Sequence, residues 1–372
     1  MNKILLIGQP TDKNRKGTVG SGGGYVRNMR VYLKYFQSEN FRIVPCFHTS
    51  RKEYGANIFS KFIRFLIDLK RFLHCLVTVR PNGIHIMAQY REALPREVMY
   101  IFISKIFNKP VLYEIKAGAF IDAYVDGSKI YKQLVRYSVL NSKIILAEGR
   151  QYLDFLMNKF EISGNYFPNV VPDEEVPSVK KNLLTNKIIK ILYVGYCYYE
   201  KGVFHLVDAV KMLKANNISV ELNFVGEEDN DFSEYLREIL NTTDKLRINR
   251  FGGKPHEFIL SKMQECDIFC YPTFHSGEGH SNSINEAMMN TMVIISTRNG
   301  FLSDILNEES AYFIKEKSST DIYSTLMEIN NNRKTASEKA INAYNNLKNN
   351  YLLSTKIDTI NDHYNELVSN NA

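Results

Sequence analysis

The chain has 372 residues, of which 44% are hydrophobic and 23% are charged, so we expect a globular protein with room for two separate cores. No apolar run reaches the length of a membrane span, and the run before Gly8 is too short for a signal peptide. The five cysteines are scattered and form no C-x2-C pair, which is typical of reduced thiols. We therefore expect a cytoplasmic location.

The net charge of +7 is distributed unevenly along the chain. Residues 1–172 carry 26 Lys and Arg against 12 Asp and Glu, a net charge of +14, whereas residues 173–372 carry 21 against 28, a net charge of −7. A basic half suits an anionic membrane, lipid phosphate or nucleic acid, or is merely a solvated surface. Because there is no RNA-binding motif, we expect peripheral contact with the inner face of the cytoplasmic membrane and no nucleic-acid partner. A solvated surface is the alternative.

The N-terminal elements have the order of a phosphate-binding arrangement. A buried strand is predicted at 4–7, followed by a polar loop that ends in Gly20-Ser-Gly-Gly-Gly24 and by a helix at about 25–36. Gly23 and Gly24 are candidate ligands, because glycines let backbone N–H groups come close to an anion. The loop matches neither the G-x-G-x-x-G fingerprint nor a Walker loop. A flexible loop without a ligand is the alternative.

From residue 41 onward, candidate strands and helices alternate. The first half has strands predicted at 42–47, 84–88, 111–115 and 143–147, and helices at 58–77, 96–107 and 130–139. This alternation predicts a parallel sheet covered by helices. In the helix at 58–77, Lys61, Arg64, Asp68 and Arg71 form a narrow, mainly basic stripe on an otherwise apolar cylinder. The stripe predicts either a core helix with a charged edge or a membrane-facing helix.

A polar, proline-containing connection at 173–185 separates the two halves, and we place a domain boundary there. The predicted domains are residues 1–172 and residues 186–354. In the second domain we expect strands at 188–195, 220–225, 246–251, 267–271 and 293–297, with helices at 232–240 and 255–264. The second domain is therefore another helix-covered sheet, and the fold class is α/β.

The stretch from Pro272 to Met288 is predicted to be a polar loop and a helix start, directly after an apolar strand. The carboxyl ends of parallel strands, next to a helix N-terminus with unsatisfied N–H groups, suit a phosphate. Small polar groups and two carboxylates eight positions apart lie in this stretch, namely Ser281, Asn282, Ser283, Glu278 and Glu286. The alternative is a solvated loop followed by a carboxylate on a helix surface.

This stretch resembles the nucleotide-sugar motif of retaining glycosyltransferases of family 4. The shared pattern is Pro-Thr-x4-Glu-Gly-x-Ser-Asn-Ser-x2-Glu-Ala-Met, which contains the E-x7-E spacing. The resemblance is strong over residues 188–314 and diffuse before them. It implies the GT-B fold, in which two Rossmann-like domains face each other across a cleft and a C-terminal helix, here at about 355–372, crosses back to the first domain.

The resemblance also implies how the donor is held. The second glutamate, Glu286, would grip the ribose hydroxyls, and the first, Glu278, would reach the transferred sugar. Lys201 resembles the lysine that neutralises the leaving diphosphate, in a phosphate loop that begins at Gly195. The family has an arginine after that glycine, whereas this chain has Tyr196, and a neutral phenol does not replace a bidentate guanidinium.

Further candidates follow from the same resemblance. Arg27, in the first domain, is the candidate for supplying the charge that the missing arginine would bring. After the strand at 111–115, related enzymes often carry a histidine, and this chain has Glu114 and Lys116 instead. We expect Lys116 to hold a phosphate or a sugar hydroxyl, with an ordinary surface lysine as the alternative. Gly253 is a candidate contact of the nucleotide base.

No metal site or cofactor is expected. His275 and His280 flank Glu278, but the spacing offers no further ligand for a closed zinc site, and no Asp-x-Asp motif follows a strand. We expect a hexosyltransferase that moves a sugar from a nucleotide diphosphate sugar, UDP-linked by family frequency, to a glycan or lipid-linked acceptor in bacterial surface polysaccharide synthesis. The alternatives are another GT-B activity, such as a sugar-nucleotide epimerase, or a catalytically degenerate binding protein.

Overall fold

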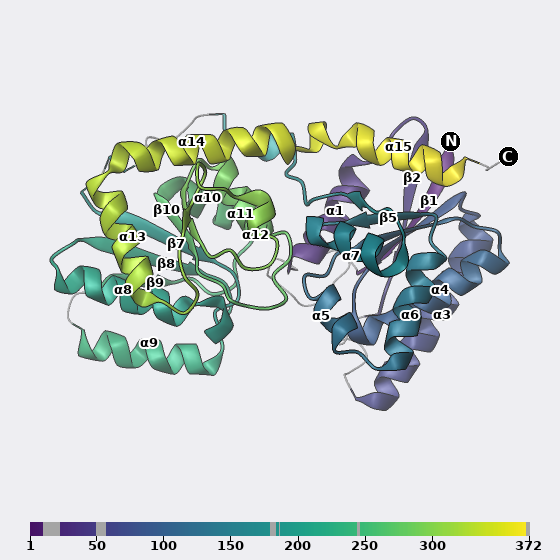
Figure 1. Ribbon diagram of the computed structural model, residues 1–372, viewed down its shortest axis with the longest axis horizontal. Coiled ribbons are helices and arrows are strands. Elements are labelled where there is room, and N and C mark those ends of the chain that lie inside the picture. Colours follow the sequence, from purple (N-terminus) through teal and green to yellow (C-terminus); the bar gives the residue numbers. More distant parts are fainter. Residues whose placement is uncertain (10–22, 50–56, 179–183, 186, 244–245, 370–372) are drawn as a thin grey trace. The chain divides into compact units, whose positions relative to one another are not determined.

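The computed structural model describes residues 1–9, 23–49, 57–178, 184–185, 187–243 and 246–369. The chain folds into two compact units (Figure 1). The first unit contains the chain as far as Asn169 together with the segment from Lys356 onward, and the second unit contains Val170–Thr355. Each unit has its own parallel sheet, so the predicted α/β class is confirmed.

The sheet of the first unit has the order β2-β1-β3-β4-β5-β6, and all of its pairings are parallel. Its central strands are buried and mainly apolar, as expected for a parallel sheet that helices cover on both faces, and His85 and Glu114 are the polar exceptions in β3 and β4. The strands are β1 (Asn2–Gly8), β2 (Phe41–Phe47), β3 (Gly83–Ala88), β4 (Val111–Ile115), β5 (Ile144–Ala147) and β6 (Asn165–Tyr166). The helices are α1 (Gly23–Tyr35), α3 (Ile58–Val79), α4 (Leu94–Ile106), α5 (Phe120–Val125), α6 (Lys129–Leu140), α7 (Arg150–Phe160) and α15 (Ile357–Val368).

The last helix, α15, packs on the first unit although 186 residues of the second unit precede it in the sequence. The Tyr364 hydroxyl lies 2.9 Å from His85 Nδ1 on β3, and both side chains are fully buried. At Gly83 the helix lies so close that a Cβ atom would be 2.7 Å from Leu367 Cδ2. The predicted return of the C-terminal helix to the first half is therefore present.

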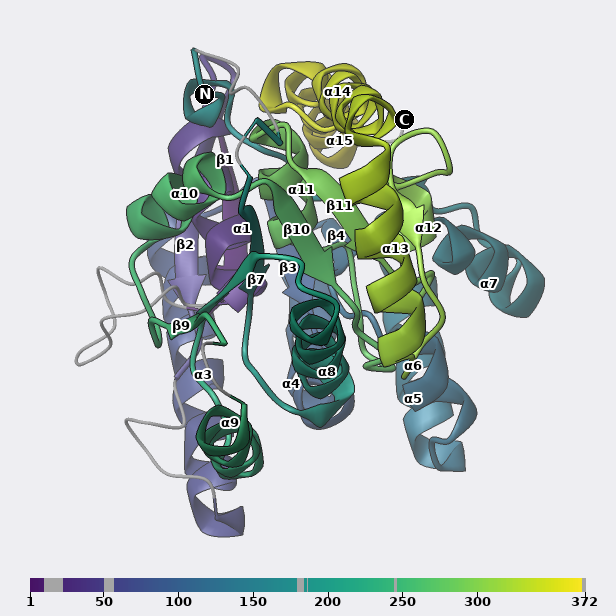
Figure 2. The same cartoon turned by 90° about the vertical axis from the view of Figure 1, so that its left-hand side faces the viewer.

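The sheet of the second unit has the order β12-β11-β10-β7-β8-β9, again entirely parallel. Its strands are β7 (Ile189–Val194), β8 (Val220–Val225), β9 (Ile248–Arg250), β10 (Ile268–Tyr271), β11 (Val293–Ser296) and β12 (Tyr312–Phe313). Its helices are α8 (Val203–Ala215), α9 (Asn230–Thr242), α10 (His256–Glu265), α11 (Asn282–Met289), α12 (Leu302–Ile305), α13 (Ser319–Asn331) and α14 (Arg333–Asn350). One face packs against α8, α9 and α13 and the other against α10, α11 and α14 (Figure 2).

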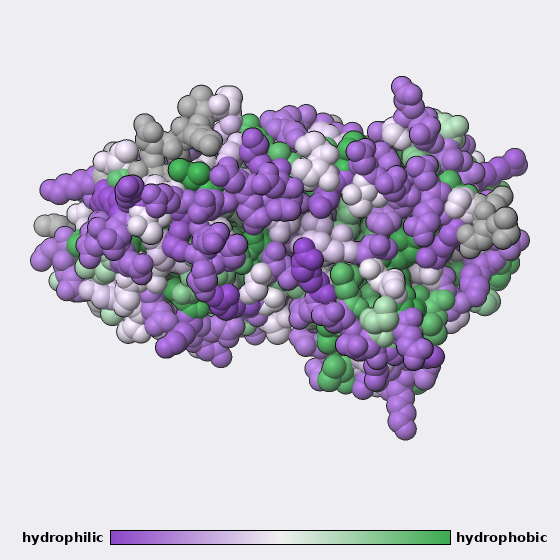
Figure 3. All heavy atoms as spheres, turned by 45° about the horizontal axis from the view of Figure 1, so that its top comes forward, coloured by the Kyte–Doolittle hydropathy of each residue, from purple (hydrophilic) through white to green (hydrophobic). Residues whose placement is uncertain are grey.

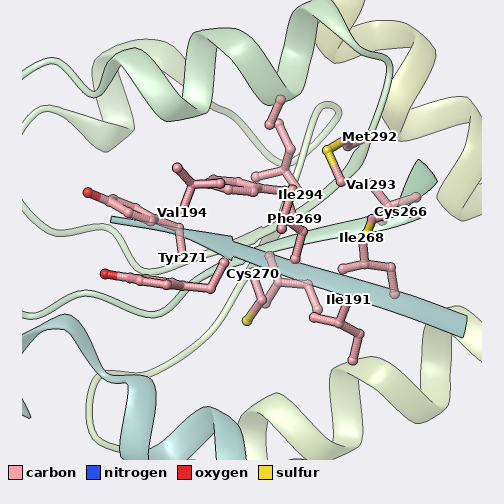
Figure 4. Close-up of a cluster of buried hydrophobic side chains, with 14 of the residues drawn as sticks. Ile191, Val194, Cys266, Ile268, Phe269, Cys270, Tyr271, Met292, Val293 and Ile294 are labelled. Atoms are coloured by element: carbon pink, nitrogen blue, oxygen red, sulfur yellow. The ribbon is translucent and has the colours of Figure 1, made fainter. Parts of the chain in front are cut away.

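Strand β10 runs through the centre of this second core, and side chains from β7 and β11 surround it (Figure 4). Its side chains are buried on both faces of the sheet. Just before the strand, the Asp267 carboxylate accepts backbone N–H groups of Leu184 and Lys190, each at 3.1 Å. These bonds fix the start of the strand. The Pro272–Met288 stretch therefore begins at a defined position, at the far end of the same strand.

Helices α1 and α3 carry the glycines and the charged stripe that the sequence singled out. Helix α1 begins at Gly23, so Gly23 and Gly24 belong to its first turn, and the loop at 20–22 lies outside the described residues. The charged stripe on α3 is directed partly inward, because Asp68 is buried and lies 2.7 Å from Arg96 Nη1 on α4. Within the described ranges, no helix has both the length and the apolar character needed to cross a bilayer.

Candidate active site

The Glu278 carboxylate in the loop between β10 and α11 accepts three side-chain donors. Tyr271 Oη donates to Oε1 at 2.9 Å, while Thr273 Oγ1 and Lys201 Nζ bind Oε2 at 2.9 and 2.6 Å. Tyr271 ends β10, and Lys201 ends the short 3₁₀ turn Tyr199–Lys201 after β7. Charge-assisted bonds of this kind are about twice as strong as neutral ones. The carboxylate and the lysine therefore form one preorganised unit at the carboxyl ends of β7 and β10.

Two glycines bring the backbone of this loop against its neighbours. Gly202, directly after Lys201, has a φ of +72°, and a Cβ atom there would lie 2.1 Å from the carbonyl oxygen of Pro272. Gly300 has a φ of +57°, and its Cβ atom would lie 2.1 Å from the carbonyl oxygen of Glu278. Any side chain at either position would push the loop away, so these glycines hold Lys201 and Glu278 in place.

Helix α11 begins at Asn282, next to this pair. Its N-cap is Ser281, whose side chain accepts the backbone N–H of Ile284, and the Ser281 and Ser283 hydroxyls lie 3.1 Å apart. The first N–H groups of a helix have no partner within it, and the positive end of the dipole attracts anions. The amino end of α11 thus combines N–H groups, two hydroxyls and the positive charge of Lys201.

Glu286 lies one turn further along α11 and is buried. Its Oε1 atom is 3.1 Å from His256 Nε2, at the start of α10. Glu286 is therefore not a solvated carboxylate on a helix surface, which was the alternative reading of the motif. A buried carboxylate that contacts a ring nitrogen is held in a defined orientation.

The loop after β7 carries Gly195 and Tyr196. A Cβ atom on Gly226 would lie 1.9 Å from the carbonyl oxygen of Gly195, so the ends of β7 and β8 are in direct backbone contact. The Tyr196 side chain is half exposed, with its ring 5.6 Å from that of Tyr198. Gly253 follows β9, and a Cβ atom there would meet the Glu227 carboxylate at 2.5 Å.

The predicted residues of the second unit therefore gather at the carboxyl ends of its strands, the edge at which open parallel sheets bind ligands. Sequence reasoning missed Tyr271, Thr273 and His256, which hold the two glutamates. Thr273 had a local signal, because it lies inside the recognised motif. Tyr271 and His256 had none, because their roles depend on contacts between distant elements.

Lys116 lies in the first unit, after β4, and its side chain is almost fully buried. Its Nζ atom is 3.1 Å from Glu114 Oε1 and 2.7 Å from Asn169 Oδ1. Glu114 also bonds His85 Nε2 at 3.0 Å and accepts the Tyr32 hydroxyl at 2.9 Å. Burial raises the pKa of Glu114, but Lys116 and His85 outweigh that effect and lower it to about 2.

The remaining predicted residues of the first unit lie on α1. Gly23 and Gly24 form its start and Arg27 follows one turn later, half-buried. The adjacent Asn28 donates to Asn169 Oδ1 at 2.8 Å, the same oxygen that Lys116 contacts. Asn169 therefore connects α1 to the end of β4, and Lys116 and this part of α1 are neighbours.

The histidines beside Glu278 have protein partners. His275 Nδ1 lies 2.8 Å from Glu200 Oε2, and the His280 ring lies 5.3 Å from that of Tyr351. In the described part of the chain, no group of three or more His, Cys, Asp or Glu side chains is placed to hold a metal ion.

Comparisons with known proteins identify a related family and similar folds. The family described as "Glycosyl transferases group 1" matches residues 177–346. Protein CapJ of Staphylococcus aureus is 26% identical over 226 residues, which are 58% of this chain and 55% of CapJ. The N,N'-diacetylbacillosaminyl-diphospho-undecaprenol alpha-1,3-N-acetylgalactosaminyltransferase of Campylobacter jejuni is 28% identical over 160 residues, 42% of this chain and 39% of that protein. The chain thus spans about half the length of these relatives, or less.

Among solved structures, the HepE protein of Anabaena in complex with UDP superposes with a TM-score of 0.69 at 13% identity, covering 97% of this chain and 99% of that one. The two parallel six-stranded sheets match the GT-B fold of solved glycosyltransferase structures. Residues 177–346, which contain the motif at 272–288, match the group 1 glycosyl transferases, the family that this motif predicted.

Proposed function

We propose that this protein transfers a sugar from a UDP-linked donor to a glycan or lipid-linked acceptor, with retention of the anomeric configuration. In this reaction the bond between the anomeric carbon and the diphosphate oxygen breaks, and the acceptor oxygen takes the place of the diphosphate. The acceptor proton and UDP are the other products. The observation that carries this proposal is the ion pair of Lys201 and Glu278 at the amino end of α11.

The proposed roles follow from the geometry of that edge. The diphosphate would lie against the N–H groups of α11, beside the hydroxyls of Ser281 and Ser283 and the amide of Asn282. Lys201 would neutralise part of its negative charge. Negative charge on the diphosphate grows as the sugar leaves, so a fixed cation there lowers the barrier. Gly195 and Gly253 would let backbone groups approach the phosphate and the base.

The two glutamates have separate proposed roles. Glu286 would accept the ribose hydroxyls, in the orientation that its contact with His256 fixes. Glu278 would contact the transferred sugar and, through its bond to Lys201, fix the lysine against the diphosphate. Tyr196 offers no positive charge to the diphosphate, so Arg27 is the proposed additional cation.

The acceptor proposal is supported by the relatives. The Campylobacter enzyme is named for a diphospho-undecaprenol substrate, and others are named for capsular polysaccharide biosynthesis. We propose a similar place for this chain, in bacterial capsule, O-antigen or exopolysaccharide synthesis at the inner face of the cytoplasmic membrane. The basic first half and Lys116, Gly23 and Gly24 are the proposed acceptor-side features.

A thermal-shift panel tests the donor proposal. We expect UDP to stabilise the chain more than GDP, ADP or TDP, in the presence of EDTA. At a hundredfold excess over Kd, binding contributes about 2.7 kcal/mol, a shift of roughly 5 to 10 °C. A shift that EDTA abolishes would show that a metal carries the diphosphate, and no shift with any nucleotide would refute the donor proposal.

A binding protein without turnover is the second candidate, favoured by Tyr196 at the position where the family has an arginine. Release of UDP from a UDP-sugar that depends on an added acceptor would exclude this candidate. Conversion of the UDP-sugar without any acceptor would instead indicate an epimerase.

A further inference from the structure

Helix α3 carries apolar side chains on a face that no other described element covers. Ile58, Phe59 and Phe62 near its amino end are 86%, 71% and 58% exposed. The full set, here called the outer apolar face, is Ile58, Phe59, Phe62, Leu66, Leu73 and Val77. From Phe59 onward, spacings of three, four, seven and four place these residues along one side of the helix over most of its length, and Ile58 lies at the edge of this side.

An adjacent side of α3 accounts for most of its packing in the first unit. Asp68, Phe72 and Leu76 are its buried residues, and the Phe72 ring lies 4.6 Å from that of Tyr100 on α4. The outer apolar face is only partly used by this core, because four of its six side chains are more than half exposed. The exposure of this apolar area to water is unfavourable.

Further exposed apolar side chains lie at the carboxyl end of α4, the helix that packs beside α3. Phe102, Ile106 and Phe107 are all exposed there. Figure 3 shows apolar side chains, in green, at the surface in the lower right of the view, among hydrophilic ones. Large apolar side chains that gather at the surface of a single chain usually mark an interaction site.

The charge around this surface decides which occupant fits. Lys70 and Arg71 are exposed on α3, and Lys105 and Lys109 lie at the end of α4. The whole of residues 1–172 carries a net charge of +14. Two like-charged copies of this face would repel each other, whereas an anionic bilayer attracts basic residues and accepts aromatic and aliphatic side chains at its headgroup boundary.

We propose that the outer apolar face of α3 is a membrane-insertion surface, which lies in the plane of an anionic bilayer with its phenylalanines below the headgroups. This inference deepens the membrane contact in the proposed function and names the residues that make it. Helix α3 is the contact element because it combines the exposed apolar side chains with flanking basic ones. The contact is peripheral, and attachment is reversible by salt.

The absence of tryptophan from the sequence allows a direct test. Phe62→Trp places a single indole on the outer apolar face, and Ile341→Trp, at an exposed position on α14 of the acidic second unit, is the matched control. With vesicles containing phosphatidylglycerol, we expect a blue shift and quenching by brominated lipid for Phe62→Trp alone. Raising the salt concentration should reverse both signals. Absence of the blue shift, or equal signals from both variants, would overturn the proposal.

The partition coefficient between water and the same vesicles measures how much each side chain contributes to membrane binding. Phe59→Ser and Phe62→Ser should each lower the partition coefficient by about tenfold or more, because each removes a large apolar side chain from the bilayer. Ile341→Ser should change nothing. Lys70→Glu should weaken binding to anionic vesicles and leave binding to neutral ones unchanged. A concentration-dependent dimer in sedimentation that Phe62→Ser abolishes would instead assign the face to a second copy of the chain.

The test separates this inference from the proposed function. The Phe62→Ser variant should keep its thermal shift with UDP and its transfer to a water-soluble acceptor, because the substitution lies far from the nucleotide site in the sequence and on an exposed face. Loss of vesicle binding with retained transfer supports the insertion surface. Retained vesicle binding without any transfer by the unmodified protein would refute the function and leave the surface standing.

Discussion

At the scale of single residues, the unusual feature is that Glu278 is already fully engaged by Tyr271, Thr273 and Lys201. A carboxylate in this state cannot move freely toward a ligand. Each carboxylate oxygen can accept more than one hydrogen bond, so in the proposed reaction a sugar hydroxyl would still bind to it. The site is thus preorganised, and its members should not contribute independently.

The two glutamates should respond differently to substitution. Glu286→Ala should weaken UDP binding by roughly ten- to a hundredfold, because a lost hydrogen bond to a charged group costs about 1.5 to 3 kcal/mol. Glu278→Gln should leave UDP binding nearly intact and lower transfer, since free UDP lacks the sugar. Lys201→Ala should reduce turnover more than donor affinity. Calorimetry with UDP and single-turnover transfer measure both effects.

Two outcomes would contradict these roles. Full transfer activity of Glu278→Gln would remove that residue from the reaction. An inverted anomeric configuration of the product, determined by NMR with the unmodified enzyme, would exclude the retaining mechanism. Tyr271→Phe is the matched control, because it removes one donor to Glu278 and leaves the lysine bond intact.

At the scale of elements, Glu114 and Lys116 tie β4 to β3 and to α1. The lowered pKa of Glu114 means that the folded state binds its proton more weakly than the unfolded chain does. The resulting stabilisation is complete above the ordinary pKa of 4.5 and is lost as the pH falls toward about 2. The first unit should therefore lose stability in this window.

Lys116→Met tests whether this lysine has a structural role. Removing one partner of a buried pair costs about 3 to 5 kcal/mol, so Tm should fall strongly and the dependence of stability on pH between 5 and 2 should become weaker. Lys129→Met, on the exposed side of α6, should change stability by less than about 0.5 kcal/mol. A variant with unchanged Tm and impaired transfer would assign Lys116 to the acceptor instead.

Local sequence patterns predicted the helices and strands well where the hydrophobic period agrees with the residues that mark the ends of these elements. The run before Pro272 and the polar residues after it placed β10 and the start of α11, because both depend on neighbours in the sequence. Helix α7 was missed, since Arg150–Phe160 begins without an N-cap side chain. The buried state of Glu114 was also missed, because its partners His85 and Tyr32 come from other elements.

At the scale of the whole molecule, the chain passes between the two units at residues 169–170 and again at 355–356. The first unit therefore depends on α15. Deleting residues 356–372 should expose His85 and leave its bond to Tyr364 unmade. We expect faster hydrogen exchange in β1 and β3 and unchanged exchange in β7 and β10. Equal acceleration in both sheets would contradict the division into two units.

The position of α15 also has a consequence for biosynthesis. A ribosome releases residues 170–355 before it releases α15, so the second unit can complete its sheet and helices while the first still lacks the helix that covers β3. Domains generally fold in order from the N-terminus during synthesis. Here the unit that begins first is the one that finishes last. Until α15 has left the ribosome, the face around His85 and Gly83 remains open, and a chaperone that binds exposed apolar segments would find it on every nascent chain.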